Sequence, residues 1–129
     1  MNIEATIISN LLHNEEYARK VIVFLKDEYF MDASEKVVFS EIRKFWTKYN
    51  NVPSKEALQI AVEEKDDISS TIYEEVEALI KSLGKTDSNK EWLLDETEKF
   101  CKDKAVYNAI MESIEIIDGK HKKKKDGAI

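Results

Sequence analysis

Apolar residues recur along the chain at spacings of three and four, which is typical of amphipathic helices. The first such run covers residues 2–13, with Ile3, Ile7, Ile8, Leu11 and Leu12 on one face. Residues that favour the first position of a helix precede the later runs. These capping residues are Asn14, Ser34, Ser54, Ser69 or Ser70, and Ser88. The pattern predicts an all-α fold of about six helices.

Two short segments interrupt the helical period in the first half of the chain. The segment 27–32 breaks the spacing, and its Tyr29 and Phe30 are predicted to point inward and close a small core. Residues 50–54 form the second interruption, where Val52 precedes Pro53 and is therefore biased away from helix. The helix between these breaks is predicted to turn apolar side chains inward at Val38, Ile42, Phe45, Trp46 and Tyr49.

The last third of the chain has longer helices. The fifth is predicted to end at Gly84, and the sixth to run from Ser88 to Asp118 with Gly119 as its stop. A helix of that length spans about 45 Å, more than a small head can cover. We therefore expect one structural unit with a helical head over 1–68, a projecting antiparallel hairpin over 69–119 and the start of a basic linker over 120–129.

The hairpin carries more apolar surface than two helices need. Between Ala105 and Ile117, nine of thirteen residues are apolar, so the sixth helix must be buried on more than one side. One side can face the fifth helix, and the other faces either the head or another chain. We expect self-association to form a dimer or a larger ring. The predicted subunit interface comprises Ile72, Val76, Leu79, Ile80, Leu83, Val106, Tyr107, Ile110, Met111 and Ile114.

Charge is distributed unevenly over the 129 residues, whose formal net charge is −6. The C-terminal tail contains five lysines, namely Lys120, Lys122, Lys123, Lys124 and Lys125. Without them and Asp126, the remainder holds 15 basic and 25 acidic residues. An acidic body repels phosphate, so any nucleic-acid contact is expected in this tail alone. The alternative interpretation is that the tail is a flexible, solvated linker, because like charges repel one another and extend the chain.

Residues that would carry catalysis are scarce. Gly84-Lys85-Thr86 looks like the end of a phosphate-binding loop, but Leu79 stands where that motif needs glycine. His13 and His121 lack a second histidine at helical spacing, and Cys101 is the single cysteine. We expect no catalytic residue, metal or cofactor in this chain. The single cysteine and the lack of a long apolar run indicate the cytoplasm, of a cell or a phage host.

An ordered set of short segments gives a more specific indication. The set comprises Glu28-Tyr29-Phe30, Tyr49, Val52-Pro53-Ser54, Ala57-Leu58, Leu79-Ile80 before Leu83, Trp92-Leu93, Glu96-Thr97-Glu98-Lys99, Ile114-Glu115-Ile116 and Gly127-Ala128-Ile129. It resembles the N-terminal domain of the replicative hexameric DNA helicases of T-even-like phages, within the DnaB-like class. The resemblance covers nearly the whole chain.

The resemblance implies a role in assembly. Hairpins would pair subunits into one tier of a hexameric ring that unwinds DNA 5′ to 3′ and docks primase. ATP and Mg²⁺ would act in a C-terminal ATPase domain that this chain lacks. Two alternatives stay open. One is a stand-alone phage adaptor acting by protein–protein contact, and the other is a small helix-turn-helix DNA binder. Acidic Glu35 and Glu41 accompany Arg43 on the third helix and disfavour the latter.

Overall fold

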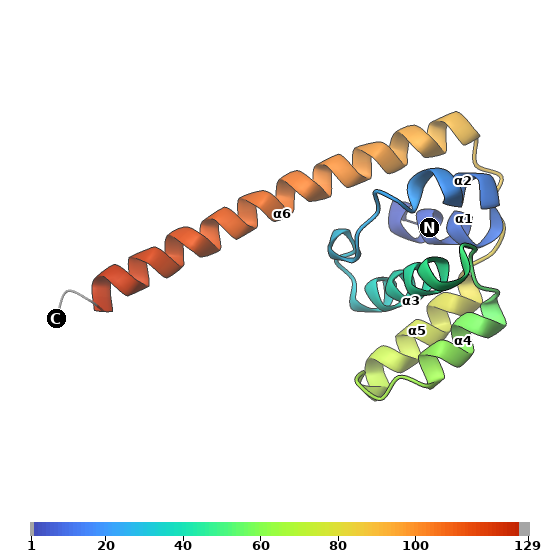
Figure 1. Ribbon diagram of the computed structural model, residues 1–129, viewed down its shortest axis with the longest axis horizontal. Helices are drawn as coiled ribbons and strands as arrows, with labels where there is room; N and C mark the ends of the chain where they lie inside the picture. The colour runs from blue at the N-terminus through green and yellow to red at the C-terminus, as the bar shows by residue number, and fades with distance from the viewer. Residues whose placement is uncertain (1, 127–129) are drawn as a thin grey trace.

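The computed structural model describes the backbone of residues 2–126 and the side chains of residues 2–120, and all regular elements in that part are helical (Figure 1). The all-α prediction is therefore confirmed. The elements are α1 (Ile3–His13), α2 (Glu15–Val21), a short 3-10 helix η1 (Asp27–Tyr29), α3 (Ala33–Tyr49), α4 (Lys55–Glu63), α5 (Ser70–Ser82) and α6 (Lys90–Asp126).

Most helix starts lie where the sequence places them. The side chains of Asn14, Ser54 and Ser69 accept the backbone N–H groups that α2, α4 and α5 leave free at their first turns. The predicted cap of α3 is wrong by two residues. Asp32 is the cap, because its carboxylate accepts the backbone N–H groups of Ser34 and Glu35. At α6 the amide of Asn89, rather than Ser88, accepts the N–H of Trp92.

Helices α1–α5 and η1 form the head, whose core is continuous. Phe30 lies at its centre, stacked on Phe39 at 4.7 Å between ring centroids and tilted against Phe100 at 5.5 Å. The inward orientation predicted for Tyr29 and Phe30 is confirmed. Tyr49 is exposed, contrary to the prediction, because it lies in the last turn of α3, beyond the buried part of that helix.

The fifth and sixth helices do not pack on each other as the two arms of a hairpin. They run in roughly opposite directions, but α1 and α3 lie between them (Figure 1). Helix α5 packs on α3 and α4, whereas α6 contacts α1, α2 and η1. The apolar stripe of α5 is satisfied inside the head, where Val76, Ile80 and Leu83 are fully buried. Helix α6 therefore projects alone.

Helix α6 is longer than the sequence predicts. It continues through Gly119 to Asp126, so that the predicted stop at Gly119 is wrong. A glycine inside a helix costs only about 1 kcal/mol relative to alanine, which a helix of 37 residues tolerates. The helix is about 55 Å long at 1.5 Å per residue. The predicted junction at Gly127-Ala128-Ile129 lies outside the described residues.

Candidate subunit interface on the projecting helix

The first three turns of α6 anchor it to the head. Leu93, Thr97, Phe100 and Cys101 recur at spacings of three and four and are all buried. Phe100 meets the ring of Tyr29 edge-on at 6.5 Å between centroids. Burial also raises the pKa of the Cys101 thiol to about 11, which keeps it protonated at neutral pH. This face of α6 is therefore a structural contact.

A buried hydrogen-bond chain joins α6 to α2. The hydroxyl of Thr97 donates to the carbonyl of Leu93 at 2.7 Å, which leaves its oxygen free to accept. The Tyr17 hydroxyl lies 2.6 Å from that oxygen and therefore donates to it. Burial is the largest cause that raises the pKa of Tyr17 above its ordinary value. Both hydroxyls are thus satisfied in an apolar setting, where an unpaired one would be costly.

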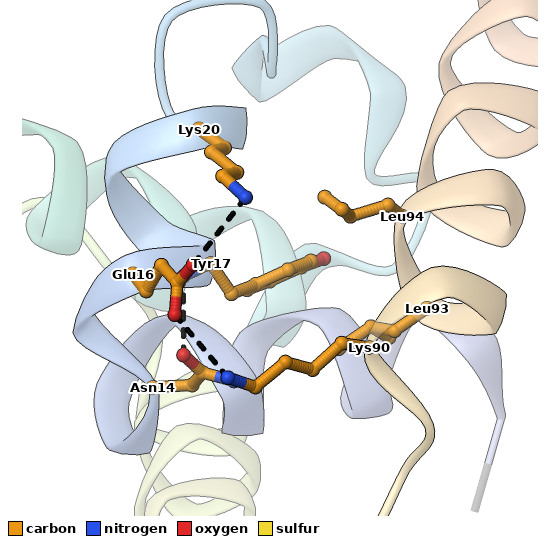
Figure 2. Close-up of a pocket in the computed structure, with 7 residues that line it drawn as sticks. All are labelled: Asn14, Glu16, Tyr17, Lys20, Lys90, Leu93 and Leu94. Carbon is orange, nitrogen blue, oxygen red and sulfur yellow. Dashed lines mark hydrogen bonds and ion pairs between the residues drawn. The ribbon is translucent and has the colours of Figure 1, made fainter.

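Ion pairs close the surface above these hydroxyls. Glu16 of α2 accepts from Lys90 of α6 at 3.2 Å and from Lys20 at 3.4 Å (Figure 2). The two lysines lower the pKa of the Glu16 carboxyl. Beneath them lies a pocket of about 20 Å³, lined by Asn14, Glu16, Tyr17, Lys20, Lys90, Leu93 and Leu94. This volume holds about one water molecule, so the pocket is not a ligand site.

The 3-10 helix η1 contacts α6 where the helix leaves the head. The Asn108 side-chain amide donates to the Glu28 carbonyl of η1 at 3.1 Å. Asp27 of η1 pairs with Arg43 of α3 at 3.1 Å, which ties η1 to the head. We call the contact of η1 with Asn108 the η1 clamp. From Ala109 to Lys120, every described side chain of α6 is exposed.

An apolar stripe begins on α6 beside the η1 clamp and continues along its projecting part. It comprises Val106, Tyr107, Ile110, Met111, Ile114 and Ile117, and all six side chains are exposed. We call this set the α6 stripe. Four of its members, Tyr107, Ile110, Ile114 and Ile117, follow the alternating spacing of three and four that pairs helices in a coiled coil. Ile116 is also exposed but lies on another side of the helix.

The structure divides the predicted interface in two. The α6 half, Val106, Tyr107, Ile110, Met111 and Ile114, lies together on one exposed face, and its role in pairing stays a prediction. The α5 half is contradicted, because Val76, Ile80 and Leu83 have no exposed surface. Ile72 and Leu79 are partly buried against the same core. Periodicity cannot distinguish a helix face that packs within the chain from one that packs on another chain.

Three residues have roles here that the sequence pattern did not assign to them. Ile117 completes the spacing of the α6 stripe and could have been found by counting heptads. The sequence does not indicate the structural roles of Thr97 and Asn108, because their partners, Tyr17 and the Glu28 carbonyl, are each 80 residues away. Polar residues on a long helix are indistinguishable from its solvated face until the fold is known.

The remaining candidates from the sequence lie in ordinary structural roles. Thr86, in the loop that resembles a phosphate-binding motif, accepts from the Asn10 side chain at 2.9 Å. The His13 ring lies 3.2 Å from the carbonyl of Leu83. Among the described side chains, no group of three His, Cys, Asp or Glu could hold a metal ion. No described helix is long and apolar enough to cross a membrane.

The basic tail is only partly described. Lys120 is exposed on α6. The side chains of Lys122, Lys123, Lys124 and Lys125 lie outside the described residues, so a nucleic-acid contact there stays a prediction.

Comparison with known proteins supports the resemblance that the sequence indicates. Over 110 residues, or 85% of its length, the chain is 34% identical to a DnaB-like replicative helicase of Enterobacteria phage T4. The chain spans 23% of the length of that helicase. No protein-family model matches the chain.

Proposed function

We propose that this chain acts as the N-terminal assembly domain of a replicative, ATP-dependent DNA helicase. Two copies pair through the α6 stripe, and pairs join into one tier of a hexameric ring that unwinds DNA 5′ to 3′ and docks primase. The observation that carries the proposal is the stripe itself, a coiled-coil-like row of apolar residues that the head leaves uncovered. The likeness to a DnaB-like replicative helicase supports the kind of assembly.

The proposal assigns chemistry to other parts of a longer protein. ATP and Mg²⁺ bind an ATPase domain outside this chain, and DNA passes through the ring that the assembled subunits enclose. The site of action is the cytoplasm of the phage host. In this proposal the chain positions the subunits relative to one another, because a helix anchored to the head at its base holds the α6 stripe away from the head.

A pair of matched substitutions tests the pairing. Ile110→Asp places a carboxylate in the α6 stripe, while Ile116→Asp places one on another side of the same helix. The two side chains have similar exposed fractions, 54% and 51%. A carboxylate buried without a partner costs several kcal/mol, so Ile110→Asp should yield a monomer. The Ile116→Asp variant should form an assembly of the same mass in solution as the unmodified protein.

Light scattering over a concentration series measures the mass, and circular dichroism checks that helicity is kept. A monomeric unmodified chain, or equal effects of the two substitutions, would contradict pairing through the stripe. If the chain pairs but does not capture primase in a pull-down, the assembly role stands and the proposed primase docking is contradicted. That result would favour the alternative of a stand-alone adaptor.

A further inference from the structure

One edge of the α6 stripe carries two opposite charges placed symmetrically about Met111. Lys104 lies seven residues before Met111, and Asp118 lies seven residues after it. Seven residues are close to two turns of a helix, so the three side chains lie in line along α6. Each charge is about 10 Å from Met111 at 1.5 Å per residue. This edge of the stripe therefore has a basic end near the head and an acidic end far from it.

Both charges lie within reach of a helix that packs on the stripe. The Lys104 ammonium group lies 5.9 Å from the centre of the Tyr107 ring, at one end of the stripe. Asp118 is exposed and directly follows Ile117, at the other end. The two charged residues are fourteen positions apart, or about 21 Å along the helix, so they cannot pair with each other within one chain.

An antiparallel pair of α6 helices brings these opposite charges together. When the twofold axis passes beside Met111, that residue meets its own copy, and Lys104 of each chain faces Asp118 of the other. A twofold contact repeats each interaction, so two ion pairs form, one on either side of the axis. The same crossing places Tyr107 near Ile117 of the other copy, so apolar residues face one another along the seam.

A parallel pair in register brings like charges together instead. In that arrangement each seam residue faces its own copy. The spacing of the stripe, continued four residues toward the head, reaches the exposed Asp103, so two Asp103 carboxylates would face each other. Lys104 would also lie about 21 Å along the helix from Asp118 of the other copy. Facing like charges disfavour a contact, so the charge pattern favours the antiparallel pair.

The head leaves space for the antiparallel arrangement. In it, the end of one α6 helix passes alongside the base of the other, on the head side of Tyr107. Lys99 and Asp103 lie on the stripe side of that base, and both are exposed. Thr97 and Cys101, which are buried against the head, lie on another side of the helix. Because each head lies at the start of its own α6, the two heads are at opposite ends of the pair (Figure 1).

We propose that two α6 helices pair antiparallel, with Lys104 of each chain bound to Asp118 of the other and Met111 beside the twofold axis. This inference rests on the proposed function, which pairs two chains through the α6 stripe without fixing their orientation. Exposed ion pairs add little affinity, so these two residues act on orientation and register. A shift of the pairing by one heptad would leave both charges unmatched.

Reversing each charge in the full 129-residue chain tests this orientation. Lys104→Glu alone, or Asp118→Lys alone, places like charges opposite each other at two sites. Either change should weaken self-association about fivefold in sedimentation velocity. An equal mixture of the two variants, one of them fluorescently labelled, should form mixed pairs with the affinity of the unmodified chain, because opposite charges then face each other at both sites. High salt should reduce these differences.

Glu112→Lys is the matched control, because it changes the charge as Asp118→Lys does, but on the side of α6 opposite the stripe. Mixed with the Lys104→Glu chain, it should not restore affinity. Recovery in this control mixture, or no recovery with Asp118→Lys, would overturn the antiparallel register and leave pairing through the stripe in place. An unmodified chain that stays monomeric would instead contradict the proposed function, and this inference with it. Circular dichroism checks that each variant keeps its helicity.

Discussion

The Asn108 amide and the Glu28 carbonyl are 80 residues apart in sequence and meet at 3.1 Å, where α6 leaves the head. Within the described residues, no hydrogen bond or ion pair joins α6 to the head beyond this point. Asn108 is therefore the last polar contact in the described part of the chain that orients the free part of the helix, beyond the packing of Phe100 on Tyr29 and of α6 on α1 and α2.

Asn108→Ala should loosen that direction while leaving the fold intact. It removes one exposed hydrogen bond, worth about 1 kcal/mol at most. We expect the distance between spin labels at Lys36 and Ser113 to spread over a wider range in double electron–electron resonance. Glu112→Gln, on the same helix and away from the clamp, should leave the distribution unchanged. An unaltered distribution in Asn108→Ala would assign the direction of α6 to apolar packing alone.

The buried pair of Tyr17 and Thr97 should show strong coupling. Thr97→Val leaves the Tyr17 hydroxyl without an acceptor and should lower the free energy of unfolding by about 2 kcal/mol. Tyr17→Phe should cost about 1 kcal/mol, because Thr97 still donates to Leu93. The double variant should cost less than the sum of the two, as measured by urea unfolding. Additive effects would show that the two hydroxyls act independently.

Stability should fall with rising pH because of Glu35. Burial, followed by the nearby charges of Glu4 and Asp32, raises its pKa from 4.5 to about 7. The folded state thus binds a proton that the unfolded state releases between these pH values, so the free energy of unfolding declines across that window. Glu35→Gln should remove this decline and stabilise the protein by about 2 kcal/mol at pH 8.

Thermal unfolding at several pH values measures the effect of Glu35. Glu63→Gln, on the exposed part of α4, is the control and should keep the decline. If Glu35→Gln unfolds with the pH dependence of the unmodified chain, another group is responsible.

Binding to DNA should be weak, independent of sequence and confined to the basic tail. Deleting residues 120–129 removes five lysines and should abolish binding at low salt in a fluorescence anisotropy titration. For the unmodified chain on duplex DNA, five phosphate contacts would give a slope of about −4.5 for log affinity against log salt. Binding that survives the deletion would place a nucleic-acid site on the head or α6.

The spacing of apolar residues was sufficient to predict the helices, because each helix buries one face. Ile7 and Leu11 in α1, and Val76 and Ile80 in α5, are four residues apart and lie on such buried faces. Periodicity does not identify the partner of a buried face. The stripe of α5 was therefore assigned to α6 and to a second chain, whereas it packs on α3 and α4. Gly119 misled the prediction because a local helix penalty is small beside the length of α6.

The candidate interface was predictable only in part, for a related reason. The excess of apolar residues over 105–117 predicts that α6 is covered on more than one side. The expected cover by the fifth helix is wrong, because the α6 stripe is exposed, and cover by a second chain stays a prediction. The contacts that position the stripe were not predictable. They depend on Tyr17, Thr97 and the Glu28 carbonyl, whose proximity arises from the tertiary fold.

Within the described side chains, α6 contacts the head from Lys90 to Asn108 and extends beyond it, so a small change of angle at Asn108 is magnified along the rest of the helix. Eighteen residues separate Asn108 from Asp126, which is about 27 Å of helix at 1.5 Å per residue. Over that length a tilt of about 10° at η1 displaces the far end by about 5 Å, roughly the spacing of two strands in a sheet. If chains pair through the α6 stripe as proposed, the angle between a head and the paired helices depends on the contact of Asn108 with Glu28 in η1.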